Sequence, residues 1–343
     1  MVYTFELIKH SNIRYRDASV RLSRCELLSL LHALSVDCDV IAETIGGGVF
    51  LTFECRELND SELRFLSAHS SVSFMAVKEP GMLLRPLTSG YTPYLPEDLP
   101  EVLKYKGKTS VPFTRMMINT AAALTPFAFQ GQPLSFFDPV CGKATACFCA
   151  LTLGMNAAGL DQDAKALKET ITYFSRYLQY HKLKHEKQEL SETYGRNAVH
   201  VTRFSFADTR EHFQAGNRRS LTLAAADTSL SPVLFRRQPV HVIAADLPYG
   251  IQHAPREGGK PESLIGFLRR ALPVWRSIMA PEAAIALSFN TLTLPSSAVR
   301  QALADSGLTP VEAEPYISLK HEVEQAVIRD VVFACNTEEE HKP

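Results

Sequence analysis

Several features that would place a sequence in a special class are missing from this one. Its 36 basic and 37 acidic side chains leave a net charge of -1, so no overall electrostatic field favours nucleic acid or a membrane surface. No apolar run reaches the ~18 residues that a membrane-spanning helix needs. Glu6 stands where a signal peptide would be basic and then apolar. We therefore expect a soluble, cytoplasmic protein.

Cysteine is too scarce and too scattered to predict a disulfide framework, since the seven cysteines are an odd number spread over 343 residues. Cys141, Cys147 and Cys149 lie close together but match no common zinc-binding spacing. We interpret them as buried apolar side chains and predict no metal site. His181 and His185 have the i, i+4 spacing of a helical zinc site, but the lysines around them favour a solvated or RNA-facing basic surface.

The composition is otherwise globular, with 45% apolar and 21% charged residues, and the length predicts about two domains. Residues 1–85 have the element order βαββαβ, which predicts a small ferredoxin-like α/β domain. We interpret residues 86–110, rich in proline, as a linker. Within the first domain we expect strands at 2–8, 38–45, 49–55 and 72–78, and helices at 27–34 and 60–68. The capping-box spacing of Ser23 and Glu26 predicts the start of the first helix.

The second domain is expected over residues 111–336, where helices and strands alternate as in a doubly wound, mostly parallel sheet. The segment 180–216 does not fit the alternation. We interpret it as an insertion with a basic helical stretch at 181–187 and a hairpin around 196–206. The two last strands, 311–316 and 326–334, are expected to form an antiparallel hairpin at one edge. The other strands are expected at 134–137, 157–160, 221–225, 240–245 and 283–288.

Four consecutive strands of this domain end in an aspartate: Asp138, Asp161, Asp227 and Asp246. A single aspartate at a strand end can simply cap a turn. Four at one edge favour a ligand site, because doubly wound folds bind nucleotides at the carboxyl ends of their strands. The Gly142 turn after Asp138 carries neither the dinucleotide fingerprint nor a P-loop.

Asp246-Leu247-Pro248-Tyr249 is the most specific of these segments. The carboxylate of Asp246 and the backbone carbonyl of Leu247 can both accept hydrogen bonds from a planar amino group. Tyr249 can stack on the ring that carries this group, and such stacking contributes roughly 1–3 kcal/mol. The segment predicts binding of an exocyclic base nitrogen with its lone pair available for attack.

Two of these segments resemble known motifs. Residues 138–145 (DPVCGKAT) resemble motif I of the class I S-adenosylmethionine-dependent methyltransferases, and residues 246–249 resemble their amino-methylating motif IV. Their order is most similar to the RNA methylase group that includes the THUMP-containing tRNA guanine-N2 methyltransferases. The resemblance covers about residues 104–335, including Phe113–Asn119 and His321–Val332. It implies a Rossmann-like, mostly parallel seven-stranded sheet with an antiparallel C-terminal hairpin.

The resemblance implies S-adenosylmethionine as the cofactor. The turn that carries Asp138, Cys141, Gly142 and Ala144 would contact its methionine part, Asp161 its ribose and Asp227 its adenine amino group. Asp246, Leu247, Pro248 and Tyr249 would hold the target amine. Ala144 stands where the family usually has a second glycine, and Leu247 where it has proline. His253 either lines the site or closes its loop, and Arg329 is expected to pair within the last hairpin.

The expected activity is methylation of an exocyclic amino nitrogen in RNA, guanine N2 of tRNA. Two alternatives stay open, which are adenine-N6 methylation of DNA or RNA and a catalytically weak, methyltransferase-like RNA-binding scaffold. The sequence also leaves open whether a small activator subunit is needed. RNA would be held by basic clusters, which lie at Lys104–Lys108, His181–Lys187, Arg218–Arg219 and Arg236–Arg237.

Overall fold

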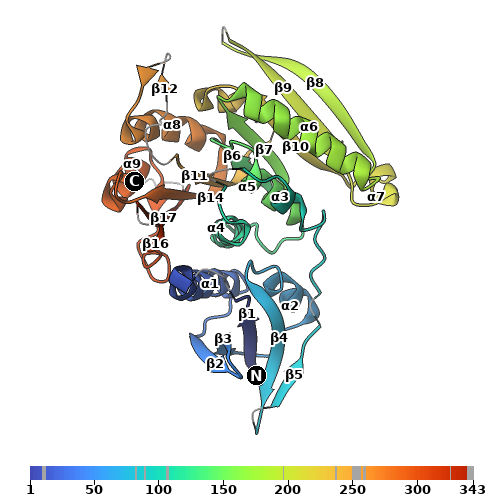
Figure 1. Cartoon of the computed structure of the whole chain (residues 1–343), viewed down its shortest axis with the longest axis vertical. Coiled ribbons are helices and arrows are strands. Elements are labelled where there is room, and N and C mark those ends of the chain that lie inside the picture. Colours follow the sequence, from blue (N-terminus) through green and yellow to red (C-terminus); the bar gives the residue numbers. More distant parts are fainter. Residues whose placement is uncertain are drawn as a thin grey trace, which may run out of the picture.

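Figure 1 shows the computed structural model of the chain, which describes residues 1–9, 13–81, 83–88, 90–105, 108–195, 197–235, 238–248, 256–257, 260–324 and 326–337. Two β-sheets follow one another along the long axis of the molecule. Helices α1 (Ile13–Ala33) and α4 (Val111–Ala123) pack against each other between them.

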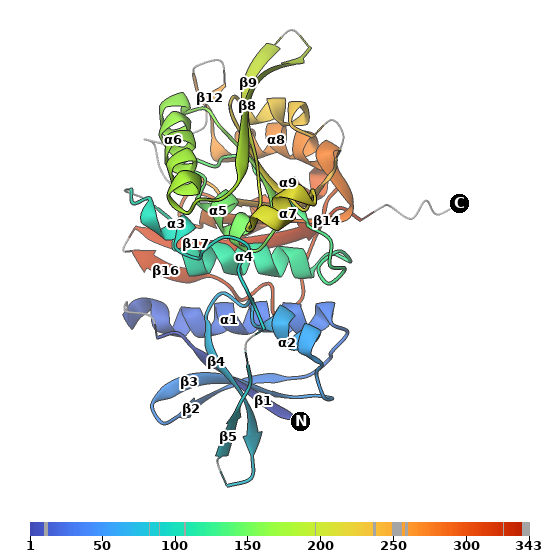
Figure 2. The same cartoon turned by 90° about the vertical axis from the view of Figure 1, so that its right-hand side faces the viewer.

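The N-terminal sheet has the strand order β2-β3-β1-β4-β5, and all of its neighbouring strands are antiparallel. The first four strands and two helices follow the βαββαβ order, so the predicted ferredoxin-like fold is confirmed. Helices α1 and α2 (Asp60–Leu66) cover one face of this sheet (Figure 2). The strands are β1 (Val2–Leu7), β2 (Val40–Ile45), β3 (Gly48–Glu54), β4 (Val72–Glu79) and β5 (Leu83–Pro86).

Helix α1 begins well before residue 27, so the expected helix start at Ser23 and Glu26 is wrong. The cause is that the apolar face of the helix continues towards the N-terminus at the spacing of three and four residues. The buried side chains that extend this face are Ala18, Leu22 and Cys25. Glu26 is therefore a buried residue of the helix interior and not part of a cap.

The larger sheet has the strand order β15-β17-β14-β11-β6-β7-β10-β9-β8. The five strands from β14 to β10 are parallel, and β17 is antiparallel to β14. After β6, β7 and β10 the chain crosses to β11 and β14 on the other side of β6. This order, with the reversed strand β17 beside β14, is the class I methyltransferase fold, and the predicted fold class is confirmed. The bounds are β6 (Ser135–Asp138), β7 (Asn156–Asp161), β10 (Arg219–Ala225), β11 (Val240–Asp246), β14 (Met279–Asn290), β15 (Thr309–Pro310), β16 (His321–Glu324) and β17 (Val327–Cys335).

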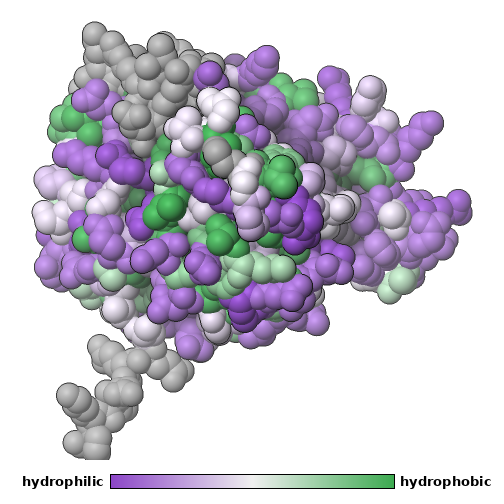
Figure 3. Space-filling view, turned by 90° about the horizontal axis from the view of Figure 1, so that it is seen from below, coloured by the Kyte–Doolittle hydropathy of each residue, from purple (hydrophilic) through white to green (hydrophobic). Residues whose placement is uncertain are grey.

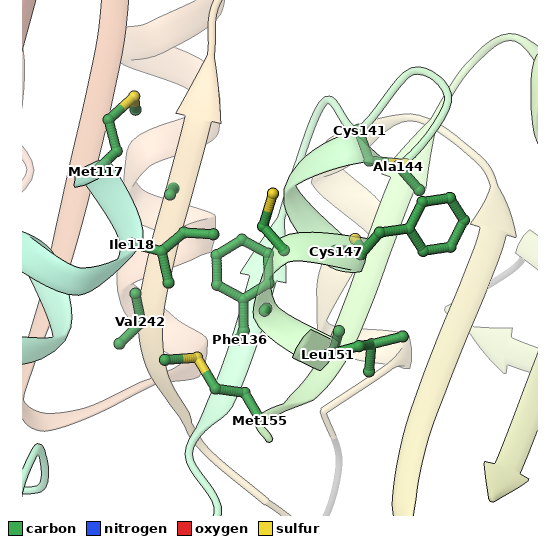
Figure 4. Close-up of a cluster of buried hydrophobic side chains, with 14 of the residues drawn as sticks. Met117, Ile118, Phe136, Cys141, Ala144, Cys147, Leu151, Met155 and Val242 are labelled. Atoms are coloured by element: carbon green, nitrogen blue, oxygen red, sulfur yellow. The ribbon is translucent and has the colours of Figure 1, made fainter. Parts of the chain in front are cut away.

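Successive side chains of the central strands point into hydrophobic cores on opposite faces of the sheet. Phe136 and Val242 join the core under α4, α5 (Thr145–Thr152) and α6 (Ala164–Tyr180), part of which Figure 4 shows. Phe137 and Ile243 join the core under η1 (Thr228–Val233), α8 (Leu264–Ile278) and α9 (Ser296–Asp305). Burial on both faces explains why these segments are continuous apolar runs. The remaining elements are α3 (Leu99–Val102), α7 (Arg210–Gln214), β12 (Arg256–Glu257) and β13 (Lys260–Pro261).

The segment 180–216 extends the sheet, and its expected basic helix at 181–187 is wrong. Helix α6 ends at Tyr180, and β8 (His185–Tyr194) pairs antiparallel with β9 (Asn197–Phe206), which pairs with β10. Buried apolar side chains of β9, such as Phe204, anchor the hairpin to the core. Pairing with β9 therefore decides the conformation of a charged segment that has no buried face of its own.

The expected strand at 311–316 is also wrong. Pairing with β17 is made by β15, just before this segment, and by one hydrogen bond from the N–H of Val311 to the carbonyl of Phe333 (2.9 Å). Residues 313–316 form a turn in which the N–H of Tyr316 donates to the carbonyl of Ala313 (2.9 Å), and Pro315 has no N–H to give to a ladder. The antiparallel edge itself is present. Within the described residues, no helix has the length and apolar character of a membrane span.

Candidate active site

Four aspartates lie along one edge of the larger sheet. Asp246, Asp138 and Asp161 are the last residues of β11, β6 and β7, and Asp227 comes shortly after β10. These strands are neighbours in the order β11-β6-β7-β10. The structure thus brings the four predicted carboxylates together, while their roles in binding stay predictions.

The turn after β6 is tied to the end of β7. The N–H of Cys141 donates to the carbonyl of Leu160 (2.8 Å), and the N–H of Gly142 donates to Asp161 Oδ2 (2.7 Å). Asp161 Oδ1 also accepts a hydrogen bond from the N–H of Asp163 (2.8 Å). The φ of Gly142 is 51°, a left-handed conformation that suits glycine. Asp161 therefore holds the shape of the turn and remains partly exposed.

Gly159 of β7 is a site residue that the sequence analysis missed. A Cβ at this position would lie 2.8 Å from Cys141 Sγ and 3.0 Å from Cys147 Sγ. Its absence lets the turn pack directly on the strand. The available signal was a glycine inside an apolar strand, which often marks a close approach of two backbones.

Ala144 is the N-cap residue of α5 and has a φ of 61° and a ψ of 30°. Its side chain is completely buried beside the turn that carries Cys141 (Figure 4). An L-residue in the left-handed region is strained by about 1–2 kcal/mol. This conformation explains why the family usually has glycine where this chain has alanine.

Asp138 is buried, and its Oδ1 accepts a hydrogen bond from the N–H of Val140 (3.1 Å). Burial raises the pKa of Asp138 to about 8, and the nearby charges of Asp161 and Asp246 act in the same direction. The carboxyl group therefore keeps its proton at neutral pH.

Asp227 already serves the protein's own structure. Its Oδ1 accepts a hydrogen bond from the N–H of Ser229 (2.9 Å), so Asp227 caps η1. The same oxygen accepts a hydrogen bond from Arg270 NH1 (2.8 Å). Gln162 Nε2 donates to Oδ2 (2.6 Å). Partial burial raises the pKa of Asp227, but the hydrogen bonds from Ser229 and Arg270 outweigh it and lower the pKa overall. The expected contact of Asp227 with an adenine amino group stays a prediction.

Asp246 is held by side chains from three other segments. Thr109 Oγ1 donates to Oδ2, and Ser288 Oγ of β14 donates to Oδ1 (2.7 Å). Arg329 NH2 of β17 lies 3.7 Å from Oδ2. Arg329 thus reaches across β14 to β11, beyond the last hairpin in which we expected it to pair. The N–H of Leu247, whose side chain is buried, donates to the carbonyl of Ser288 (2.8 Å).

Several predicted contacts lie outside the described residues. These include Tyr249 of motif IV, His253 after it, and the basic pair Arg236 and Arg237. Pro248 is described and is partly exposed.

The expected linker contributes to both ends of the site. Tyr105 Oη and Thr145 Oγ1 share a hydrogen bond (2.7 Å), and Lys143 Nζ lies 5.5 Å from the Tyr105 ring centroid. Thr109 meets Asp246 at the other end. Composition identified this segment as a linker, but only its tertiary contacts reveal these roles.

The cysteines and histidines form no metal site in the part of the chain that the structure describes. Cys141 and Cys147 are buried, and burial raises the pKa of both thiols well above the usual value. His181 follows the end of α6 and His185 begins β8, so the two do not share a helix face.

The residues at this edge fit a positively charged nucleoside cofactor such as S-adenosylmethionine. Asp161 and Asp246 are partly exposed carboxylates on the strands that flank β6. Carboxylates are suitable acceptors for ribose hydroxyl groups and favour a cationic ligand. Asp161 would offer an acceptor for ribose at the same place where it holds the Gly142 turn.

Comparisons with known proteins concern the fold. No protein-family model matches the sequence, and a search of curated proteins finds no match. The solved structures that resemble it include TrmN from Thermus thermophilus, with 17% identity, coverage of 89% of this chain and 64% of that chain, and a TM-score of 0.38. The chain therefore spans less than two thirds of the Thermus protein.

Two other similar structures are a magnesium protoporphyrin IX methyltransferase and an rRNA methylase. The first, from Synechocystis PCC 6803 with bound SAM, has 13% identity, coverage of 67% of this chain and 87% of that chain, and a TM-score of 0.38. The second, from Streptococcus thermophilus, has 10% identity, coverage of 68% of this chain and 100% of that chain, and a TM-score of 0.36.

Proposed function

We propose that this chain is an S-adenosylmethionine-dependent methyltransferase that acts on an exocyclic amino nitrogen of a nucleobase in RNA, guanine N2 of tRNA. The observation that carries the proposal is the placement of Asp246 beside Asp138 and Asp161 on neighbouring strands. This arrangement puts the carboxylate expected to bind the amine next to the turn expected to bind the cofactor. The class I methyltransferase fold supports the same reading.

The proposed mechanism depends on positioning. When bound, S-adenosylmethionine supplies an electrophilic methyl group. Asp161 would accept hydrogen bonds from the ribose hydroxyl groups while it holds the turn at Gly142. Asp246 would accept a hydrogen bond from the amino group, which orients the nitrogen and stabilises the positive charge that develops on it. Asp138 is protonated at neutral pH and would add no second negative charge beside this group.

The basic residues predicted to hold RNA lie close to acidic ones. Near the β8–β9 hairpin, Lys187 pairs with Glu189 (2.7 Å) and Arg218 with Glu186 (3.2 Å). At the end of the molecule formed by the N-terminal unit, hydrophilic residues surround small hydrophobic patches (Figure 3). We therefore expect phosphate contacts to be distributed over the surface and not concentrated on the 181–187 segment.

The test is transfer of tritium from labelled S-adenosylmethionine to total tRNA, rRNA and DNA, followed by identification of the labelled nucleoside. N2-methylguanosine in tRNA is the expected product, and N6-methyladenine would overturn the guanine assignment. Asp246→Ala should abolish transfer, whereas the exposed α9 variant Asp305→Ala should not. Binding of both cofactor and RNA without transfer to any acceptor would favour the scaffold alternative that Ala144 motivates.

A further inference from the structure

Behind Asp246, three side chains from distant segments form one cluster. The guanidinium carbon of Arg329 in β17 lies 4.6 Å from the ring centroid of Phe113, near the start of α4. The same ring lies 5.6 Å from the ring of His321 in β16. All three residues belong to stretches included in the family resemblance, which assigned them no catalytic role.

Strand register brings this cluster to the candidate active site. Asp246 of β11 lies opposite Ser288 of β14, and Arg329 of β17 lies opposite Asn290 of the same strand β14. Ser288 donates to Oδ1 of Asp246, and the guanidinium of Arg329 faces Oδ2 at 3.7 Å. Two successive strands of the sheet therefore contribute one side chain each to the same carboxylate.

The side chain of Arg329 is only 7% exposed, and burial of its positive charge is unfavourable unless a group of opposite charge lies nearby. A buried ion pair is often no more stabilising than apolar side chains of similar volume. His321 adds no second positive charge beside the guanidinium, since burial lowers the pKa of this histidine to about 4 and leaves the ring neutral at neutral pH. The carboxylate of Asp246 lies next to the guanidinium and supplies a negative charge there.

We infer that Arg329 is a positioning residue that acts through Asp246 and holds its carboxylate in the orientation in which it meets the target amine. This inference rests on the proposed function. The Phe113 ring orients the guanidinium by a cation–π contact, and Ser288 and Thr109 fix the two oxygens from other directions. The side chain of Asp246 is 23% exposed, so an amine can reach it from solvent while Arg329 holds it from the protein side.

The experiment compares the full chain with the variants R329M, R329K, D246N and D246N/R329M. The control is R300M, which changes a partly buried arginine of α9. For each protein we would measure kcat and KM for tRNA methylation and the Kd for S-adenosylmethionine.

R329M should lower kcat about 10-fold to 100-fold, the size expected when a reacting group is misplaced, with KM and Kd unchanged. R329K should recover part of the loss because it keeps the charge without the planar guanidinium. D246N/R329M should be no slower than D246N, and R300M should match the unchanged chain. Two results would overturn the inference. One is an unchanged kcat in R329M, and the other is a decrease in kcat from D246N to D246N/R329M as large as the decrease that R329M causes alone.

Urea unfolding of the same proteins gives a readout that does not depend on activity. R329M should destabilise the chain less in the D246N background than alone, because the partner of the contact has already changed. Additive effects on unfolding would overturn the inference whatever the activity. If the effects of R329M and D246N on unfolding are not additive but the unchanged chain transfers no methyl group, the proposed function is overturned and the contact between the two residues stands.

Discussion

Asn119 of α4 donates a hydrogen bond to Glu26 of α1, with Nδ2 2.7 Å from Oε1. Glu26 is completely buried and also accepts hydrogen bonds from the N–H (2.8 Å) and the hydroxyl (2.5 Å) of Ser70. Asn119 Nδ2 and Arg115 NH2 both donate to the carbonyl of Ala68, at 3.0 and 3.2 Å. One helix of the larger unit is thus fastened to a helix and a turn of the N-terminal unit, which fixes how the two units meet.

Asn119→Ala should lower the free energy of unfolding by about 1–3 kcal/mol, because it removes a donor from a buried acceptor. Urea unfolding measures this loss. The control is Gln301→Ala, which removes an exposed amide that donates to Asp305 and should change stability by less than about 0.5 kcal/mol. Equal effects of the two substitutions would show that the contact between Asn119 and Glu26 does not hold the units together.

Ala144→Gly should change stability little and leave methyl transfer similar or modestly faster. Glycine relieves about 1–2 kcal/mol of left-handed strain, but it also gives up a buried methyl group worth about 0.8 kcal/mol. Thermal unfolding and the tritium-transfer rate measure the two effects. A large loss of stability would mean that the packing of this methyl group outweighs the strain.

Asp161→Ala should weaken S-adenosylmethionine binding by about 1.5–3 kcal/mol, the contribution of hydrogen bonds to a charged group. Part of the loss would come from the turn, because Gly142 loses its acceptor. Equilibrium binding to the folded variant is the measurement, and Asp305→Ala is the carboxylate control. Unchanged affinity in the Asp161 variant would rule out this ribose site.

Gly159→Ala should destabilise the chain by about 1–3 kcal/mol, because the new Cβ would overlap Cys141 Sγ at 2.8 Å. The double variant with Cys141→Ala should lose less free energy of unfolding than the sum of the two single variants, since removal of Sγ takes away the shortest contact of the new Cβ. Urea unfolding of the four proteins measures this difference. If the losses of the two single variants simply add in the double variant, the destabilisation by Gly159→Ala does not come from contact with Cys141 Sγ.

The pH dependence of stability should carry a contribution from Asp138. Burial raises the pKa of this carboxyl group to about 8 in the folded chain, above the ~4 of an unfolded aspartate. The folded chain therefore binds more protons between these two values, and the contribution of Asp138 to stability is complete at acid pH and is lost as the pH rises towards 8.

Asp138→Asn removes this titration, so the stability of the variant relative to the unchanged chain should rise between pH 5 and 8. Each kcal/mol corresponds to a shift of about 2–4 °C in Tm. Melting curves across this range provide the measurement, with Asp305→Asn as the exposed control. Parallel curves for Asp138→Asn and the unchanged chain would contradict the raised pKa.

Local sequence was sufficient to predict the central strands and the aspartates at their ends. Phe136 and Phe137 lie in an apolar run because a central strand is buried on both faces, and such runs are visible without any tertiary contact. An aspartate directly after the run marks the carboxyl end of the strand. The sequence by itself therefore determined the fold class and which edge of the sheet carries the four carboxylates.

Only the tertiary structure decided the features that depend on partners distant in the sequence. The charged segment at 185–194 became a strand because β9 pairs with it. The carboxylate of Glu26 can be buried inside a helix because Ser70 and Asn119 donate hydrogen bonds to it. Arg329 reaches Asp246 because β14 sets the register of both neighbouring strands. Hydrogen bonds and charge contacts across more than eighty residues, as between Arg329 and Asp246, leave no periodic signal in the sequence, so the supports of the site could be identified only once the chain was folded.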